Sequence, residues 1–171
     1  LLRQGEQGYQ LTWMDAKVGD WVVTPRIGKP VEINSLWYHA LCLMSAFAKQ
    51  LGEPSQTYEN ASRKARGNFH RFWNEETGCL YDVLNGEERD ASIRPNQIFA
   101  VSLPNSMVSS DRAESILRVV ERELLTPRGL RTLSPNDSRY IGNYEGDPRR
   151  RDGAYHQGTV WPWLMGAYIT A

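Results

Sequence analysis

The sequence lacks the features that mark several large classes of protein. It has only two cysteines, Cys42 and Cys79, and their spacing fits neither a metal site nor a redox pair, so we expect free thiols in or near the interior. Its twenty Lys and Arg residues are balanced by twenty Asp and Glu residues. Nucleic acids and anionic membranes favour a basic surface. We therefore expect neither as a partner, and a neutral ligand fits the composition better.

Long hydrophobic runs are also missing. No apolar run approaches the roughly 20 residues that a transmembrane helix needs, and no signal peptide is visible. We therefore expect a cytoplasmic protein. The sequence has no initiator Met, its first residues carry no cap or strand pattern, and it stops inside a helical pattern at Ala171. We interpret residues 1–171 as part of one domain truncated at both ends, whose partners include the remainder of its own polypeptide.

Three long polar segments, each rich in aromatic residues, run directly into helices that are apolar on nearly every side. A helix that is apolar all round is expected to be buried. The pairs of segment and helix are Thr12–Glu32 with Ile33–Leu51, Asn85–Gln97 with Ile98–Leu103, and Arg131–Gly158 with Thr159–Ala171.

Between the buried helices, Gln56–Trp73 and Ser110–Leu125 are apolar along one stripe only, which is typical of helices on the surface. Alternation of buried and surface helices predicts an all-α fold, a two-layered helical ring. The short run Cys79–Leu84, turning at Asn85-Gly86, predicts a β-hairpin inserted between helices. Because every long segment enters a buried helix, we expect the long segments to meet on one rim.

The residue types on this predicted rim suit a neutral, polyhydroxylated ligand. Aromatic rings pack on the C–H faces of sugars, and amide and guanidinium groups satisfy sugar hydroxyls. Carboxylates beside such a ligand are the catalytic groups of glycoside hydrolases. The segments contribute Trp, Tyr, Asn, Gln, Arg, Asp and Glu residues. The composition of the rim thus makes a glycosidase plausible without identifying one.

Several motifs resemble the glucosidase domain of glycogen debranching enzymes. They spread across most of the chain in the order of that family. They are Thr12-Trp13-Met14-Asp15, Thr24-Pro25-Arg26, Val31-Glu32-Ile33, Arg94-Pro95-Asn96-Gln97, Gly129–Ser134, and Tyr155-His156-Gln157-Gly158 followed by Trp161.

The resemblance implies an incomplete (α/α) toroid and an amylo-α-1,6-glucosidase, which releases glucose from the branch points of glycogen or a related α-glucan without a cofactor. By carry-over, Asp15 is the general acid of a two-carboxylate inverting mechanism. The catalytic base belongs to an acidic segment that the family pattern places beyond Ala171. The expected substrate-binding residues are Trp13, Arg26, Glu32, Asn96, Gln97, His156, Gln157 and Trp161.

Two alternatives stay open at this point. The first is a related inverting glycosidase on the same toroid, similar to a glucoamylase or a trehalase. The second is a glucan-binding fragment without catalytic activity. Individual residues also have simpler interpretations: Glu32 opens a helix, where a carboxylate favours the helix dipole, and Arg149–Arg151 read as a solvated run of charge. His156 has no second His or Cys at ligand spacing, so we expect no metal site.

Overall fold

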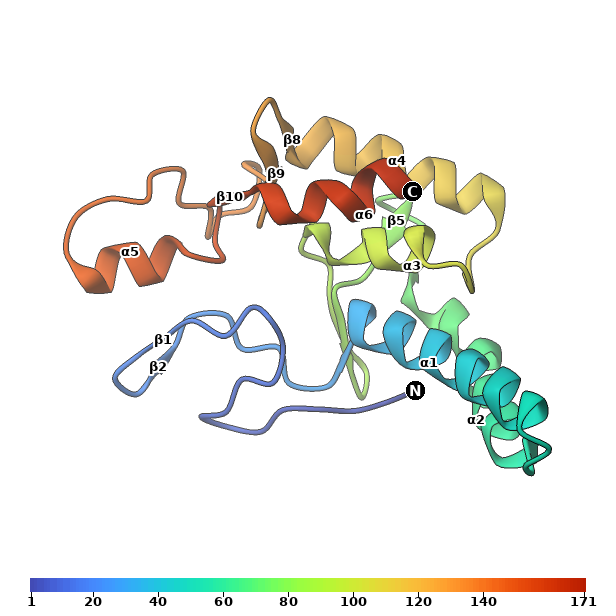
Figure 1. The fold of residues 1–171 in the computed structure, drawn as a ribbon. Helices are drawn as coiled ribbons and strands as arrows, with labels where there is room; N and C mark the ends of the chain where they lie inside the picture. The colour runs from blue at the N-terminus through green and yellow to red at the C-terminus, as the bar shows by residue number, and fades with distance from the viewer.

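The structure, a computed structural model, describes all 171 residues. Helices α1 and α2 lie side by side, and α3 lies between α1 and the C-terminal helix α6, with α4 against α3 (Figure 1). This agrees with the predicted two layers, because α1, α3 and α6 form one row while α2 and α4 pack outside it. The helices are α1 (Val31–Gln50), α2 (Gln56–Phe69), α3 (Ile98–Ser102), α4 (Ser110–Leu124), α5 (Pro148–Ala154) and α6 (Met165–Thr170), with short 3-10 turns at His70–Phe72, Pro95–Gln97 and Pro162–Leu164.

The surface helices pack as their apolar stripes predict. In α2 the buried residues are Ala65 and Phe69, four positions apart on one face. In α4 the buried residues are Ile116, Val119, Val120 and Leu124, and the opposite face carries the charges. Residues three and four positions apart share a helix face, so each stripe turns toward the row formed by α1 and α3.

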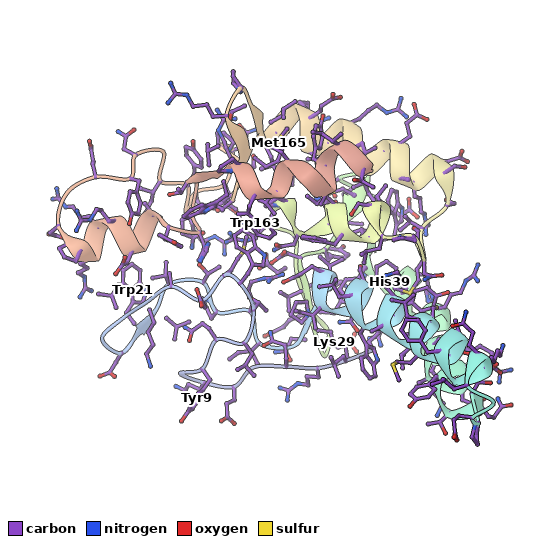
Figure 2. The ribbon with its side chains drawn as sticks, in the orientation of Figure 1. Tyr9, Trp21, Lys29, His39, Trp163 and Met165 are labelled. Carbon is purple, nitrogen blue, oxygen red and sulfur yellow. The ribbon has the colours of Figure 1, made fainter.

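The prediction that the inner helices are fully buried is wrong for α1 and α6. Figure 2 shows α1 running outward from the middle of the molecule, and Trp37 on this helix is 39% exposed. The apolar residues on the open side of α1 include Leu43, Met44 and Phe47, and α6 has no buried residue. The physical reason is that within residues 1–171 each of these helices is covered on one side only.

The expectation of an all-α fold is also wrong, because ten short strands accompany the helices. They form four small antiparallel sheets: β1 (Lys17–Val18) with β2 (Trp21–Val22); β3 (Lys29–Pro30), β6 (Val83–Asn85) and β7 (Glu88–Asp90); β4 (Trp73–Asn74) with β5 (Cys79–Leu80); and β8 (Leu125–Thr126), β9 (Gly129–Arg131) and β10 (Val160–Trp161). The predicted hairpin at Asn85-Gly86 is confirmed as β6–β7. Strands of two or three residues are too short to show an alternating pattern, so the remaining strands could not be predicted from the sequence.

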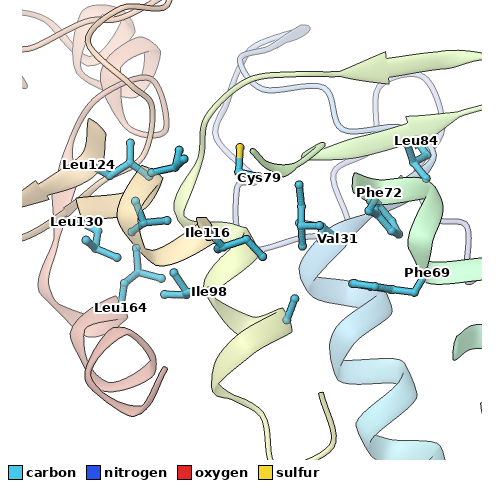
Figure 3. Packing of buried hydrophobic residues seen from close by; sticks show 14 residues of the cluster. Val31, Phe69, Phe72, Cys79, Leu84, Ile98, Ile116, Leu124, Leu130 and Leu164 are labelled. Atoms are coloured by element: carbon cyan, nitrogen blue, oxygen red, sulfur yellow. The ribbon is translucent and has the colours of Figure 1, made fainter. Parts of the chain in front are cut away.

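The hydrophobic core lies where α3, α4, the 3-10 turn Pro162–Leu164 and the strands after α2 meet. Figure 3 shows Ile98 of α3 between Ile116 of α4 and Leu164, with Val31 and Phe72 at the other end of the cluster. Cys79 is buried in this core and Cys42 is half-buried, and both are free thiols as expected. The core therefore fixes the N-terminal ends of α1 and α3, from which the long segments extend.

The long segments gather at one end of the helices. Figure 1 shows the β1–β2 hairpin, α5 and β10 together on one side, away from the far ends of α1 and α2. The third segment is not wholly irregular, because Asp147 caps α5 by accepting a hydrogen bond from the backbone N–H of Arg150. None of the helices combines the length and the apolar character that a membrane-spanning helix requires.

Candidate functional site

Arg26 lies between two buried carboxylates. Its guanidinium donates to both carboxylate oxygens of Glu32, at 2.5 and 2.7 Å, and to both oxygens of Asp82, at 2.6 and 3.0 Å. The fifth N–H donates to the hydroxyl of Thr12 at 3.2 Å. A guanidinium has five N–H donors, so all of them are satisfied within the chain.

Charge compensation explains how this cluster tolerates burial. Desolvation alone would lower the pKa of Arg26, but the carboxylates of Asp82 and Glu32 outweigh it and hold the pKa above its usual value. Arg94 is buried in the same region, with its Nε 3.8 Å from Asp82, and here desolvation dominates and lowers the pKa. The four side chains together carry two positive and two negative charges, which is the condition under which buried charges persist.

The cluster connects to the first motif through Asn96. The amide of Asn96 donates to Asp82 at 2.7 Å, and its carbonyl oxygen accepts from the indole N–H of Trp13 at 2.8 Å. Asn96 is completely buried. The position and ring plane of Trp13 are therefore set by a hydrogen-bonded chain that begins at Arg26.

Arg94 fastens the third long segment to the second. It donates to the backbone carbonyls of Thr132 and His156, at 3.0 and 2.6 Å, and to the side-chain oxygen of Gln157 at 2.8 Å. Gln157 in turn donates to the carbonyl of Val23 at 3.3 Å. The fully buried Arg94 thereby holds the Tyr155–Gly158 motif in place.

Next to this buried network lies a cluster of aromatic rings beside one exposed carboxylate, that of Asp15. The ring of His156 lies edge-on between Trp13 and Tyr155, with centroid distances of 5.1 and 4.8 Å. Its Nε2 is 3.8 Å from Oδ1 of Asp15, whose side chain is 68% exposed while the ring of His156 is buried. Met14 next to Asp15 is fully buried, so the backbone is anchored directly before the exposed acid.

The two ring nitrogens of His156 are buried and have no hydrogen-bond partner in the protein. Burial lowers the pKa of His156 to about 4, and the nearby carboxylate of Asp15 opposes that shift only in part. A neutral imidazole offers one donor and one acceptor nitrogen. The polar group that Nε2 faces is the carboxylate of Asp15.

Trp13 and Trp161, two of the predicted substrate-binding residues, lie on either side of Tyr155 and His156. The ring of Trp161 is 4.7 Å from that of Tyr155, and its N–H donates to the carbonyl of Tyr155 at 3.2 Å. Trp13 also contacts the half-exposed Trp163 at 5.0 Å, a neighbour that the motifs did not indicate. Figure 2 shows Trp163 directed from the start of the last helix toward the centre of the molecule.

The structure brings all nine predicted site residues into one region but gives them different surroundings. Asp15, Trp13 and Trp161 have exposed or half-exposed side chains. The remaining six are at least nine-tenths buried: Arg26, Glu32, Asn96, Gln97, His156 and Gln157. Gln97 accepts from the backbone N–H of Leu80 at 3.0 Å, which is a structural contact.

Two important residues are not among the predicted site residues. Asp82 binds Arg26 and Asn96, and Arg94, which opens one of the motifs, holds the Tyr155–Gly158 motif in place. The available signal for Asp82 was a lone carboxylate inside the apolar run Cys79–Leu84. A buried acid in such a run needs a charged partner. Nowhere in the chain do three or more His, Cys, Asp or Glu side chains gather so as to hold a metal ion.

Comparison with known proteins identifies the family. A family model described as amylo-alpha-1,6-glucosidase matches residues 1–171. The chain belongs to the amylo-alpha-1,6-glucosidase family. A glycogen debranching enzyme from Saccharomyces cerevisiae is 31% identical over 88 residues, in a match that covers 48% of this chain and 6% of the yeast protein. The match therefore spans a small fraction of that relative.

Two of the solved structures with a related fold are of a GH63 mannosylglycerate hydrolase. The mannosylglycerate hydrolase from Thermus thermophilus, solved with Tris, matches with a TM-score of 0.64 and 18% identity over 81% of this chain and 31% of its own. The same enzyme solved with glucose matches with a TM-score of 0.64 and 16% identity over the same shares of both chains. At such low identity these matches establish only the fold of this member of the amylo-alpha-1,6-glucosidase family.

Proposed function

We propose that this chain supplies the general-acid half of an amylo-α-1,6-glucosidase active site, with Asp15 as the acid. The observation that carries the proposal is the exposed carboxylate of Asp15 beside the buried, unpartnered ring of His156 and the ring of Trp13. A general acid must reach the glycosidic oxygen, which an exposed carboxylate can do. Membership of the amylo-alpha-1,6-glucosidase family supports the bond type, and glycogen or its limit dextrin is the proposed substrate.

The glucose subsite is proposed to be formed by Trp13, His156 and Trp161. His156 lies beside Asp15 and Trp13, and Trp161 is connected to His156 through the ring of Tyr155. Arg26 and Glu32 are proposed to support this subsite and not to contact the substrate, because the five donors of the guanidinium are satisfied inside the protein. Asn96, Gln97 and Gln157 are likewise engaged in buried hydrogen bonds. A preorganised support of this kind holds the groups that contact substrate within a narrow range of positions.

The catalytic base is proposed to come from a segment outside residues 1–171. Inversion requires a second carboxylate roughly 6.5–9.5 Å from the acid, with a water molecule between them. Glu32 and Asp82 are buried and bound to Arg26, so neither can activate a water on the exposed side of Asp15. We further propose that residues 1–171 form part of one (α/α) toroid, which the row of α1, α3 and α6 with α2 and α4 outside supports.

The test uses the complete protein that contains this chain. Glucose release is measured with a branched limit dextrin and, in parallel, with maltose, trehalose and isomaltose. Preference for the limit dextrin supports the proposal. Preference for maltose or trehalose would show a different glycosidase, and binding of glucan without release of glucose from any of the four would show a non-catalytic role.

A further inference from the structure

An open pocket of about 730 Å³ lies between the β1–β2 hairpin, α5 and the segment that precedes α5. Ligand pockets commonly have volumes of ≈ 300–1,000 Å³. This pocket is separate from the group formed by Asp15, Trp13 and His156, because none of these three residues lines it.

The lining combines aromatic rings with polar groups of both charges. Trp21 is 41% exposed, and Tyr140 is half-buried. The charged side chains are two acids and two bases, so the pocket has no net charge; they are Glu145, Asp147, Arg149 and Arg150, with Asn143 beside them. An aromatic surface surrounded by balanced polar groups suits an uncharged polyol, because C–H faces pack on the rings while the polar groups satisfy hydroxyls.

Trp21 is held in position by α5. Its ring lies close to Gly153, where a β-carbon would come within 3.1 Å of the indole, and the guanidinium of Arg149 lies 5.4 Å from the ring centroid. Figure 2 shows Trp21 between the hairpin and α5. The absence of a side chain at Gly153 thus allows the indole to approach the helix.

The pocket adjoins the proposed active site along the chain at both of its walls. The β1–β2 hairpin that carries Trp21 begins two residues after Asp15. The opposite wall, α5, contacts β1 and ends at Ala154, directly before Tyr155 and His156. Ile141, which lines the pocket, donates its backbone N–H to the carbonyl of Gln157 at 2.7 Å, so the pocket adjoins the segment that carries His156.

We propose that this pocket binds the α-1,4-linked glucan chain that carries the branch, as the leaving-group site of the glucosidase. The inference rests on the proposed function for its ligand class. The volume is sufficient for several glucose units, and the absence of net charge fits a neutral glucan. Trp21 is a substrate-positioning residue here, and Tyr140 and Asn143 border the same chain.

The test measures binding of maltoheptaose to the complete protein by titration calorimetry, which requires no turnover. Trp21→Ala is expected to weaken binding about 10-fold, which corresponds to roughly 1.4 kcal/mol for the lost aromatic contact. Trp21→Phe should retain most of the affinity. Unchanged binding of maltoheptaose in Trp21→Ala would overturn the proposal.

A second variant tests whether weaker binding in Trp21→Ala could come only from a displacement of α5. Arg150→Ala removes an exposed side chain of the pocket, and Arg118→Ala removes an equally solvated arginine on α4 as the matched control. Arg150→Ala should weaken binding of maltoheptaose about 3-fold or more, and Arg118→Ala should not change it. Equal effects of the two variants, or inorganic phosphate displacing maltoheptaose from the wild type, would refute a glucan site here.

These measurements separate failure of the pocket proposal from failure of the proposed hydrolase function. If the protein releases no glucose but Trp21→Ala loses binding of maltoheptaose, the pocket is a glucan site and the proposed hydrolysis is wrong. If glucose is released from limit dextrin and Trp21→Ala changes neither its KM nor the binding of maltoheptaose, the pocket proposal is wrong and the hydrolase stands.

Discussion

His156 and Asp15 meet across a boundary between protein interior and solvent. Nε2 of His156 is buried and lies 3.8 Å from Oδ1 of Asp15, while the carboxylate side chain is 68% exposed. Desolvation lowers the pKa of His156 to about 4 despite the neighbouring carboxylate. The ring is therefore neutral at pH 7, and the exposed acid has a neutral hydrogen-bonding group as its neighbour instead of a cation.

This burial predicts a pH dependence of stability. The pKa of an unfolded histidine is about 6.5, so between pH 6.5 and 4 the unfolded state binds a proton that the folded state does not. The contribution of His156 is thus fully present above pH 6.5, and it is lost progressively as the pH falls to about 4. The melting temperature of the wild type should decrease more steeply over this window than that of His156→Gln.

Calorimetric scans of both proteins at half-unit steps from pH 7.5 to 4 make the comparison, because carboxylates titrate in both and cancel in the difference. The difference should be on the order of 3 kcal/mol across the window, from about 1.4 kcal/mol per pKa unit. Parallel curves for the two proteins would show that His156 is not held neutral by burial.

Removal of Arg26 should destabilise the protein strongly. Arg26→Ala leaves the buried carboxylates of Glu32 and Asp82 without their shared partner, and breaking a buried ion pair costs roughly 3–5 kcal/mol. Arg26→Lys should recover little, because an ammonium cannot bind two carboxylates in the planar geometry of a guanidinium. The free energy of unfolding in urea measures both effects.

The matched control for Arg26 is Arg118→Ala, which removes an arginine from an exposed pair with Glu114 at 3.1 Å. Exposed pairs contribute roughly 0–1 kcal/mol. A loss for Arg26→Ala no larger than that for Arg118→Ala would contradict the structural role given to the cluster. The double variant Arg26→Ala with Glu32→Gln should be more stable than Arg26→Ala alone, because it removes one unpaired charge.

Gly158 should not tolerate a side chain. Its φ is +149°, a conformation that favours glycine, and a β-carbon there would overlap the carbonyl oxygen of Ile141. The N–H of Ile141 donates to the carbonyl of the adjacent Gln157 at 2.7 Å, so the overlap also disturbs this contact. Gly158→Ala is expected to lower the melting temperature by several degrees, as strained substitutions do.

Gly166→Ala on α6 is the control for this prediction, since a β-carbon there meets nothing within 4 Å. Alanine is favoured over glycine inside a helix by about 1 kcal/mol. Gly166→Ala should therefore leave the melting temperature unchanged or raise it. Equal destabilisation by the two substitutions would mean that the Tyr155–Gly158 motif is not packed as described.

The sequence predicted the helices better than the strands, and the positions of the motifs better than the contacts that hold them. Amphipathic stripes in α2 and α4 are local patterns, so the buried faces of these helices were predictable. Burial of α1 depends on which elements cover it, and Trp37 accordingly is more exposed than its helix pattern suggested. Motif positions located Arg26 and Glu32, but only the three-dimensional contact with Asp82 shows that their charges are paired internally.

Asp15→Asn is the decisive variant for the proposed acid. In the complete protein it should lower turnover of branched limit dextrin by roughly 100-fold or more, since loss of general acid catalysis typically costs 10²–10⁴ in rate. A glucosyl substrate with a leaving group that needs no proton, such as α-glucosyl fluoride, should lose far less activity. This difference separates a missing proton donor from a distorted site, because a distorted site slows both substrates equally. Asn has nearly the size of Asp. Because the side chain of Asp15 is exposed in the wild type, the substitution should not disturb the core. Turnover of limit dextrin within a few-fold of the wild type would remove Asp15 from the mechanism and leave the buried carboxylates, both bound to Arg26, as poor substitutes.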